Sequence, residues 1–183
     1  MTTLTYYTAT TLDGFIADPH DSLDWLLRQP HDDNGLLNYE DFIVDIGAIV
    51  MGSTTYQWVR DHYPDEWLYT MPAWVLTSRE LQPPAGSDVR FASGDVHPVY
   101  DDMIAAADGK NLWVVGGGEL AGRFADAGLL DEVIVSIAPV TLGAGRPILP
   151  RRLDLELLEV GRNGALVAAR YKVSGPLTED RHP

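Results

Sequence analysis

The sequence predicts an α/β fold: a mostly parallel central sheet with helices on both faces and an antiparallel hairpin at the C-terminus. Apolar runs of strand length alternate with helix-like segments up to about residue 138, and this alternation is typical of parallel strands joined by helical crossovers. Two β-prone runs then follow, at 155–160 and 166–173, separated by the glycine-bounded segment 161–164. Such a link favours a hairpin, which gives the parallel sheet an antiparallel edge.

Each element follows from its local pattern. Residues 4–10 alternate and are rich in Thr and Tyr, which predicts a strand. Residues 48–51 form a buried apolar strand, after which Ser53 or Thr54 is expected to cap a helix that runs to about Arg60. A helix over 98–107 is expected to carry acids in its first turn, and one over 119–127 to stop at Gly128. Further strands are expected at 73–77, 89–91, 112–115 and 133–138, helical segments at 24–27 and 36–45, and Gly/Pro loops at 18–22, 31–35 and 141–149.

Length and composition indicate one globular domain. The chain has 183 residues, 45% of them hydrophobic and 22% charged, which suits a single domain over residues 1–175 with a flexible tail at 176–183. No apolar run approaches the roughly 20 residues of a membrane span, and no leader-like segment opens the sequence. We therefore expect a cytoplasmic protein without a membrane partner. The absence of cysteine excludes disulfides, thiolate catalysis and cysteine-ligated metals.

Charge limits the ligands that the protein can take. The formal net charge is −14 and the basic residues do not cluster, so nucleic acid is not an expected partner. A phosphate ligand would have to be held by backbone N–H groups and a few arginines. The five histidines show neither metal-ligand spacing nor a carboxylate cluster, so no metal site is expected.

The segment after the predicted strand 112–115 is the strongest functional signal. Gly116, Gly117 and Gly118 lead directly into a predicted helix. Glycine lets a bulky anion approach the backbone closely, and a helix N-terminus presents free N–H groups to it. A dinucleotide fingerprint of the Rossmann type would need an acid at the end of the next strand, where the sequence has Ser136–Ala138 instead. The alternative interpretation is a tight strand–helix turn without a ligand.

Two further strand ends strengthen the case for a nucleotide. Strand 48–51 runs through Gly52 into a helix whose first turn carries Ser53, Thr54 and Thr55. Ligands of open α/β sheets bind at the carboxyl ends of the strands, so a pyrophosphate could lie across both helix N-termini. Plain helix capping is the alternative here. Residues 77–79 (Thr-Ser-Arg) follow strand 73–77 and could hold a ribose and its 2′-phosphate, although Arg79 could equally be an ordinary surface residue.

The order and spacing of these motifs resemble the dihydrofolate reductase family. The similarity covers about residues 2–173 and is greatest to the branch that includes the C-terminal reductase domain of the riboflavin-biosynthesis protein RibD. Its motifs are Ala9 with Leu-Asp-Gly-Phe-Ile-Ala at 12–17, Met-Gly-Ser-Thr-Thr at 51–55, Leu-Thr-Ser at 76–78, Val-Gly-Gly-Gly-Glu-Leu at 115–120 and Pro-Val-Thr-Leu-Gly-Ala-Gly-Arg-Pro at 139–147.

This resemblance implies NADPH as the cofactor. Ala9 and Ile16 would flank the nicotinamide, with the phosphates at the two helix N-termini. The family often places a basic residue where this chain has Ser53 and Glu119, which puts more weight on Arg79 for the 2′-phosphate. The expected cofactor-binding residues are Ala9, Ile16, Gly52, Ser53, Thr54, Thr55, Thr77, Ser78, Arg79, Val115, Gly116, Gly117, Gly118, Glu119 and Leu120.

The resemblance says less about the substrate. True folate reductases carry a carboxylate about 15 residues before the Met-Gly pair, where this chain has Leu36 and Leu37, so we expect that folate is not the main substrate. Trp25 and Arg146 are the candidate substrate contacts. Asp13 and Asp24 are candidate proton donors, and for each a role in a turn or helix cap is the alternative.

The resulting hypothesis is an NADPH-dependent reductase of a small heterocycle, either a pterin or a pyrimidine flavin precursor, with the loop 18–35 closing over the substrate. The alternative is a nucleotide-binding module or degenerate reductase without catalysis. Because relatives in the RibD branch are commonly dimers formed through C-terminal strands, we expect a homodimer that uses the edge hairpin 155–173.

Overall fold

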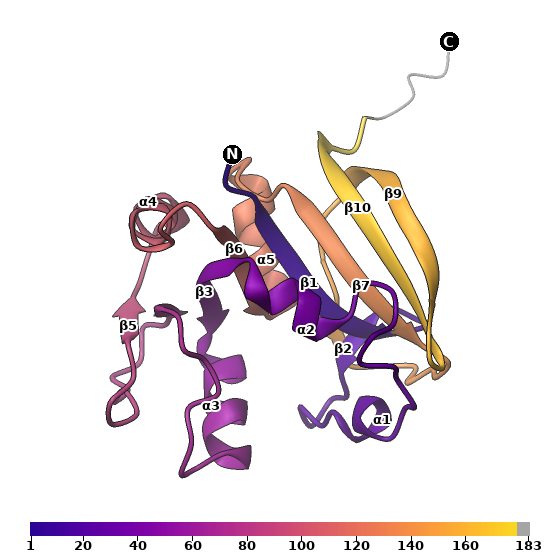
Figure 1. Ribbon diagram of the computed structural model, residues 1–183, viewed down its shortest axis with the longest axis horizontal. Coiled ribbons are helices and arrows are strands. Elements are labelled where there is room, and N and C mark those ends of the chain that lie inside the picture. Colours follow the sequence, from indigo (N-terminus) through magenta and orange to yellow (C-terminus); the bar gives the residue numbers. More distant parts are fainter. Residues whose placement is uncertain (179–183) are drawn as a thin grey trace.

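The computed structural model describes residues 1–178 and places eight strands in one sheet (Figure 1). Their order is β5-β4-β3-β6-β1-β7-β10-β9. The first six strands are parallel, whereas β10 is antiparallel to both β7 and β9. The predicted fold class is therefore confirmed. The strands are β1 (Leu4–Thr11), β3 (Ile46–Gly52), β4 (Ala73–Leu76), β5 (Val89–Ala92), β6 (Asn111–Gly116), β7 (Glu132–Ala138), β9 (Leu153–Asn163) and β10 (Leu166–Pro176).

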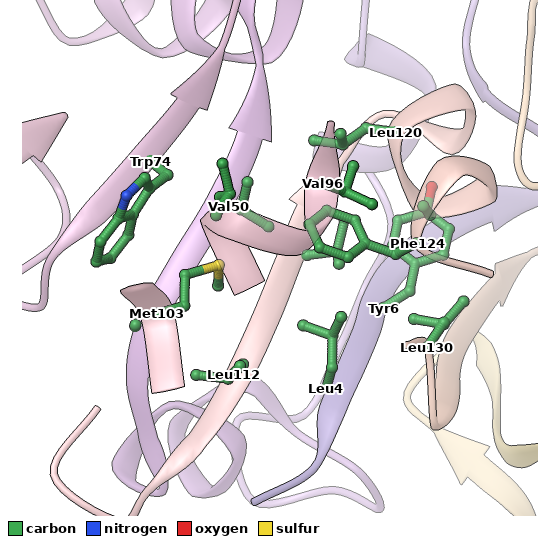
Figure 2. Packing of buried hydrophobic residues seen from close by; sticks show 14 of the residues in the cluster. Leu4, Tyr6, Val50, Trp74, Val96, Met103, Leu112, Leu120, Phe124 and Leu130 are labelled. Atoms are coloured by element: carbon green, nitrogen blue, oxygen red, sulfur yellow. The ribbon is translucent and has the colours of Figure 1, made fainter. Parts of the chain in front are cut away.

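Helices cover both faces of this sheet. On one face, Met103 and Phe124 pack over Leu4, Tyr6 and the neighbouring strands in a fully buried cluster (Figure 2). On the other face, Tyr56, Phe42 and Trp113 belong to a second, aromatic cluster. In residues 1–178 no helix is both long and apolar enough to cross a membrane. The helices are α1 (Asp24–Leu27), α2 (Tyr39–Val44), α3 (Ser53–His62), α4 (Val96–Ala106) and α5 (Gly118–Asp126).

The beginnings of three helices differ from the prediction. Helix α2 starts three residues later than expected, because Leu37 has a positive φ of 53° and Asn38 caps the helix. Helix α4 begins at Val96 with Asp95 as its N-cap, and its first turn holds no acid. The expected Ser53 or Thr54 cap of α3 is also wrong, since Gly52 occupies the N-cap position.

A two-stranded sheet joins the N-terminal turn to the predicted loop 141–149. Strand β2 (Phe15–Ala17) pairs with β8 (Arg146–Pro147), so this loop contains a short strand that its composition did not indicate. Gly145 has a φ of 157°, and a Cβ there would lie 2.2 Å from the carbonyl oxygen of Ala17. Only glycine fits this close approach, which holds the loop against β2.

The first residues of the expected tail continue the sheet or bond to it. Strand β10 continues to Pro176. The Leu177 N–H donates to the carbonyl of Arg152 (2.9 Å), and the backbone N–H of Thr178 donates to the Asp154 carboxylate (2.9 Å). Residue 176 thus belongs to β10 and not to the expected tail, residues 177 and 178 are hydrogen-bonded to the sheet, and residues 179–183 lie outside the described residues.

Candidate functional site

The glycines singled out in the sequence meet at the carboxyl ends of β3 and β6. A Cβ on Gly52 would lie 3.8 Å from the carbonyl oxygen of Gly116, and one on Gly116 would lie 3.4 Å from Thr55 Oγ1. A Cβ on Gly117 would lie 3.6 Å from Ile16 Cδ1. Strand β2, the start of α3 and the start of α5 therefore form one cluster.

Two helix N-termini open into this cluster without a side-chain cap. Gly52 is the N-cap of α3 and Gly117 that of α5, and neither helix has a side-chain hydrogen bond at its cap. By contrast, Asn38 caps α2 and Asp95 caps α4 through their side chains. The first N–H groups of a helix need an acceptor, and the positive end of its dipole favours an anion. The alternative that a hydroxyl of Ser53, Thr54 or Thr55 merely caps α3 is therefore wrong, because Gly52 is the N-cap.

Gly118, the third glycine of the run, is required for packing within the protein. A Cβ on Gly118 would lie 2.2 Å from the Ile148 carbonyl oxygen and 2.4 Å from that of Pro147. Its absence lets the chain's own loop pack against the start of α5. Packing alone therefore requires glycine at position 118, whereas a Cβ at Gly116 or Gly117 would make only contacts of 3.4 Å or more.

A groove of about 670 Å³ runs between α3 and the loop 20–24. Thr54 and Arg79 lie on its walls, so two of the predicted cofactor residues come together there. The Arg79 backbone N–H donates to Thr77 Oγ1 (2.9 Å), which closes a tight turn directly after β4. The groove is lined by His20, Asp21, Ser22, Leu23, Asp24, Thr54, Gln57, Trp58, Asp61, His62, Arg79 and Arg146.

Sequence reasoning missed the part of this wall that α3 contributes. Gln57, Trp58 and Asp61 line the groove together with Thr54. Their positions relative to Thr54 are i+3, i+4 and i+7, the spacing of one helix face. Once Thr54 was placed at a ligand-binding helix start, this spacing would have identified them.

Two predicted site residues are held in ion pairs. The guanidinium of Arg146 donates twice to Asp21 (2.7 and 3.2 Å), which links the loop 18–24 to β8. The carboxylate of Glu119 accepts two hydrogen bonds from Arg151 (2.8 and 3.2 Å), and these bonds lower its pKa. Glu119 thus follows the glycines in sequence, but its carboxylate binds Arg151.

Asp13 joins the turn after β1 to the loop 141–149. Its carboxylate accepts hydrogen bonds from Thr11 Oγ1 (2.5 Å) and from the backbone N–H groups of Leu142 (3.0 Å) and Gly143 (2.7 Å). These bonds, chiefly that from Thr11, hold the pKa of Asp13 below its ordinary value. A carboxyl group so stabilised in its charged form is a poor proton donor at neutral pH, which favours the turn interpretation of Asp13.

No acid among the described residues is buried where it could give a substrate its proton. Asp24 is exposed on the groove wall, and no Asp or Glu is among the buried residues of the described chain. Where a folate carboxylate would be expected, Leu36 lies against Gly161 and the Leu37 carbonyl accepts a hydrogen bond from the Tyr7 hydroxyl (3.0 Å).

In residues 1–178 no three His, Asp or Glu side chains are grouped as metal ligands.

Trp25 is buried next to the end of β1. It is 5% exposed and packs with Ala138 and Leu166, with Ala9 and Leu142 against the same cluster. Its Nε1 has no hydrogen-bond partner among the described residues. Of the two residues expected to flank a nicotinamide, Ala9 thus packs against the cluster that contains Trp25, and Ile16 lies beside Gly117.

A second hollow of about 430 Å³ lies at the opposite ends of the strands. Its lining includes Gly47, Asp108 and Lys110, none of them from the glycine cluster. Since ligands of such sheets bind at the carboxyl ends, we place the functional site at the groove beside α3.

Comparisons with known proteins show the family and the fold of the chain. A profile of the RibD C-terminal domain matches residues 2–165. The uncharacterized protein YwjB of Bacillus subtilis (strain 168) is 31% identical over 171 residues, which cover 90% of this chain and 94% of YwjB. A crystal structure from Shewanella sp. PV-4, assigned by name to riboflavin biosynthesis, aligns with a TM-score of 0.80 at 27% identity, over 95% of this chain and 99% of that one. Dihydrofolate reductase from Enterococcus faecalis, solved with NADP(H), aligns with a TM-score of 0.56 at 16% identity, over 94% and 96% of the two chains, and so shares the fold.

Proposed function

Because the chain belongs to the family of RibD C-terminal domains, we propose that it is an NADPH-dependent reductase that transfers a hydride to a small heterocycle of the pterin or pyrimidine flavin-precursor type. One observation carries the proposal: the uncapped N-termini of α3 and α5 meet at Gly52, Gly116 and Gly117 beside the groove. Two converging helix N-termini suit a pyrophosphate.

The residues present fit NADPH. The first N–H groups of α3 and α5 would bind the pyrophosphate, with Thr54 and Thr55 beside it. Arg79 would contact the 2′-phosphate of the adenosine ribose, and Ala9 and Ile16 would hold the nicotinamide. When bound, the cofactor supplies the hydride. The protein positions the two reactants and excludes water through the buried surface around Trp25.

Arg79 gives the proposal a test of cofactor choice. Replacing Arg79 with alanine is expected to weaken NADPH binding by about tenfold, since a charge-assisted hydrogen bond to a phosphate contributes roughly 1.5–3 kcal/mol and Arg79 is partly screened by water. NADH lacks the 2′-phosphate, so its affinity should not change. Calorimetric titration of both nucleotides measures this, and an equal loss for both would remove Arg79 from the 2′-phosphate site.

The chemistry is tested with NADPH deuterated at C4. The purified protein is incubated with it and with dihydropterins, aminopyrimidine flavin precursors and small carbonyl compounds in turn. Deuterium in a product, found by mass spectrometry and absent without protein, supports a reductase. NADPH binding without deuterium transfer to any of them would contradict it.

The second candidate is a nucleotide-binding module without catalysis. The observation that favours it is the lack of a buried Asp or Glu among the described residues, which leaves no carboxylic acid positioned in the interior to give the substrate its proton. An ordered water could supply this proton instead, and the deuterium experiment separates the two candidates.

We also propose a homodimer formed through β9. This strand is one of the two edges of the eight-stranded sheet, and Leu157 and Val160 on it are 53% and 56% exposed. An exposed apolar edge needs cover. Light scattering should give a dimer mass for the wild type and a monomer mass for Leu157→Asp. A monomeric wild type at micromolar concentration would refute this.

A further inference from the structure

The lining of the groove combines an aromatic side chain, Trp58, with three carboxylates. Trp58 lines the groove, and the His62 ring stacks on it with centroids 3.9 Å apart and planes 19° apart. His62 Nδ1 also lies 2.8 Å from the carbonyl oxygen of Trp58. The indole is therefore held in place as a surface on which a planar ring can stack.

Carboxylates outnumber guanidinium groups in the groove lining. Asp21, Asp24 and Asp61 line the groove, against the two guanidinium groups of Arg79 and Arg146. Asp61 accepts a hydrogen bond from the neutral amide of Gln57 (2.8 Å), which leaves its charge uncompensated.

Arg146 lines the same groove and is already held by one of its carboxylates. Its Nε and Nη2 both donate to Asp21. A substrate phosphate would have to compete with Asp21 for Arg146, and would do so beside Asp24 and Asp61. If Arg79 serves the cofactor, no uncommitted guanidinium among the groove-lining residues remains for the substrate. The net charge of −14 adds to the repulsion of an anion.

From this arrangement we infer that the substrate is a planar heterocycle without a phosphate or carboxylate group, stacked on Trp58. The inference rests on the proposed reductase function and narrows its substrate class: of two heterocycles that differ only in a phosphate ester, the groove takes the dephosphorylated one.

Matched ligand pairs test the inference. Riboflavin and FMN, and uridine and UMP, are titrated separately into the full-length protein with and without NADPH. Tryptophan fluorescence is followed in the wild type and in Trp58→Phe, so that the quenching that depends on Trp58 can be isolated. We expect at least one pair to bind, and the unphosphorylated member to bind at least about fivefold tighter, the size of a few like-charge interactions near a surface.

Charge-neutralising variants show whether the acids cause this preference. Asp21→Asn releases Arg146 and Asp61→Asn removes a negative charge from the groove lining, so each should improve FMN binding relative to riboflavin by about two- to fivefold. Asp101→Asn, on α4 outside the groove, is the matched control and should leave the ratio unchanged. Melting temperatures of all variants verify that they fold.

The outcomes are distinct. Tighter binding of the phosphorylated members, or an unchanged ratio in both Asp21→Asn and Asp61→Asn, would overturn the inference, as would failure of both pairs to bind at millimolar concentration. If NADPH does not bind but the pairs show the expected preference, the reductase function fails while the charge selectivity of the groove stands.

Discussion

Replacing Gly117 with alanine is expected to weaken NADPH binding at least about tenfold while leaving the protein folded. Gly117 has an extended backbone with φ −93° and ψ −171°, which any residue can adopt. A Cβ there would make an ordinary contact of 3.6 Å with Ile16 Cδ1. The added methyl group therefore fits the protein, but it occupies the space through which a phosphate reaches the first N–H groups of α5. A tenfold loss corresponds to about 1.4 kcal/mol.

Calorimetric titration of the wild type and Gly117→Ala with NADPH measures this loss, and a thermal melt without ligand shows whether the variant keeps its stability. Unchanged affinity in a folded variant would show that no ligand approaches Gly117. A fall in stability comparable to that of the next variant would show that Gly117, too, serves packing.

Gly118→Ala is expected to produce the opposite pattern, a large loss of stability. The new Cβ would lie 2.2 Å from the Ile148 carbonyl oxygen, so either the loop 146–148 or the start of α5 must move. Both are backbone segments, and such overpacking costs about 2–3 kcal/mol. In a chain of this length, the loss lowers the melting temperature by roughly 5–10 °C.

Thermal and urea unfolding test this prediction. The melting temperature and the free energy of unfolding are compared in one series for the wild type, Gly117→Ala and Gly118→Ala. A melting temperature of Gly118→Ala within about 1 °C of the wild type would mean that the loop 146–148 yields easily. The adjacent glycines would then no longer differ in the way that the structure implies.

Much of the fold could be predicted from the sequence because its signals are local. Buried strands, helix stops and the hairpin each depend on a few neighbouring residues, and the pattern at 48–52 and 112–118 correctly predicted two glycine-led helix starts on one sheet. The family was identified because those motifs occur in a fixed order along the chain.

The errors concern contacts between distant segments. Whether Ser53 caps α3 depends on backbone geometry that composition does not determine. Glycine is needed at position 118 because the Ile148 carbonyl oxygen, thirty residues further along the chain, packs against it. The Glu119 carboxylate is likewise bound by a distant residue, Arg151. The local sequence predicts only that Trp58 is part of a helix. Its place in a groove depends on the loop 20–24, which lines the same groove.

A melting-temperature titration with NADPH and NADH tests the central claim most directly. A ligand that binds only the native state adds about 2.7 kcal/mol of stability at one hundred times its Kd, which for a protein of this size raises the melting temperature by roughly 5–10 °C. We expect that rise with NADPH, and a much smaller one with NADH at the same concentration. No shift with either nucleotide at millimolar concentration would contradict the account, because the uncapped helix starts and the glycines would then serve only the fold.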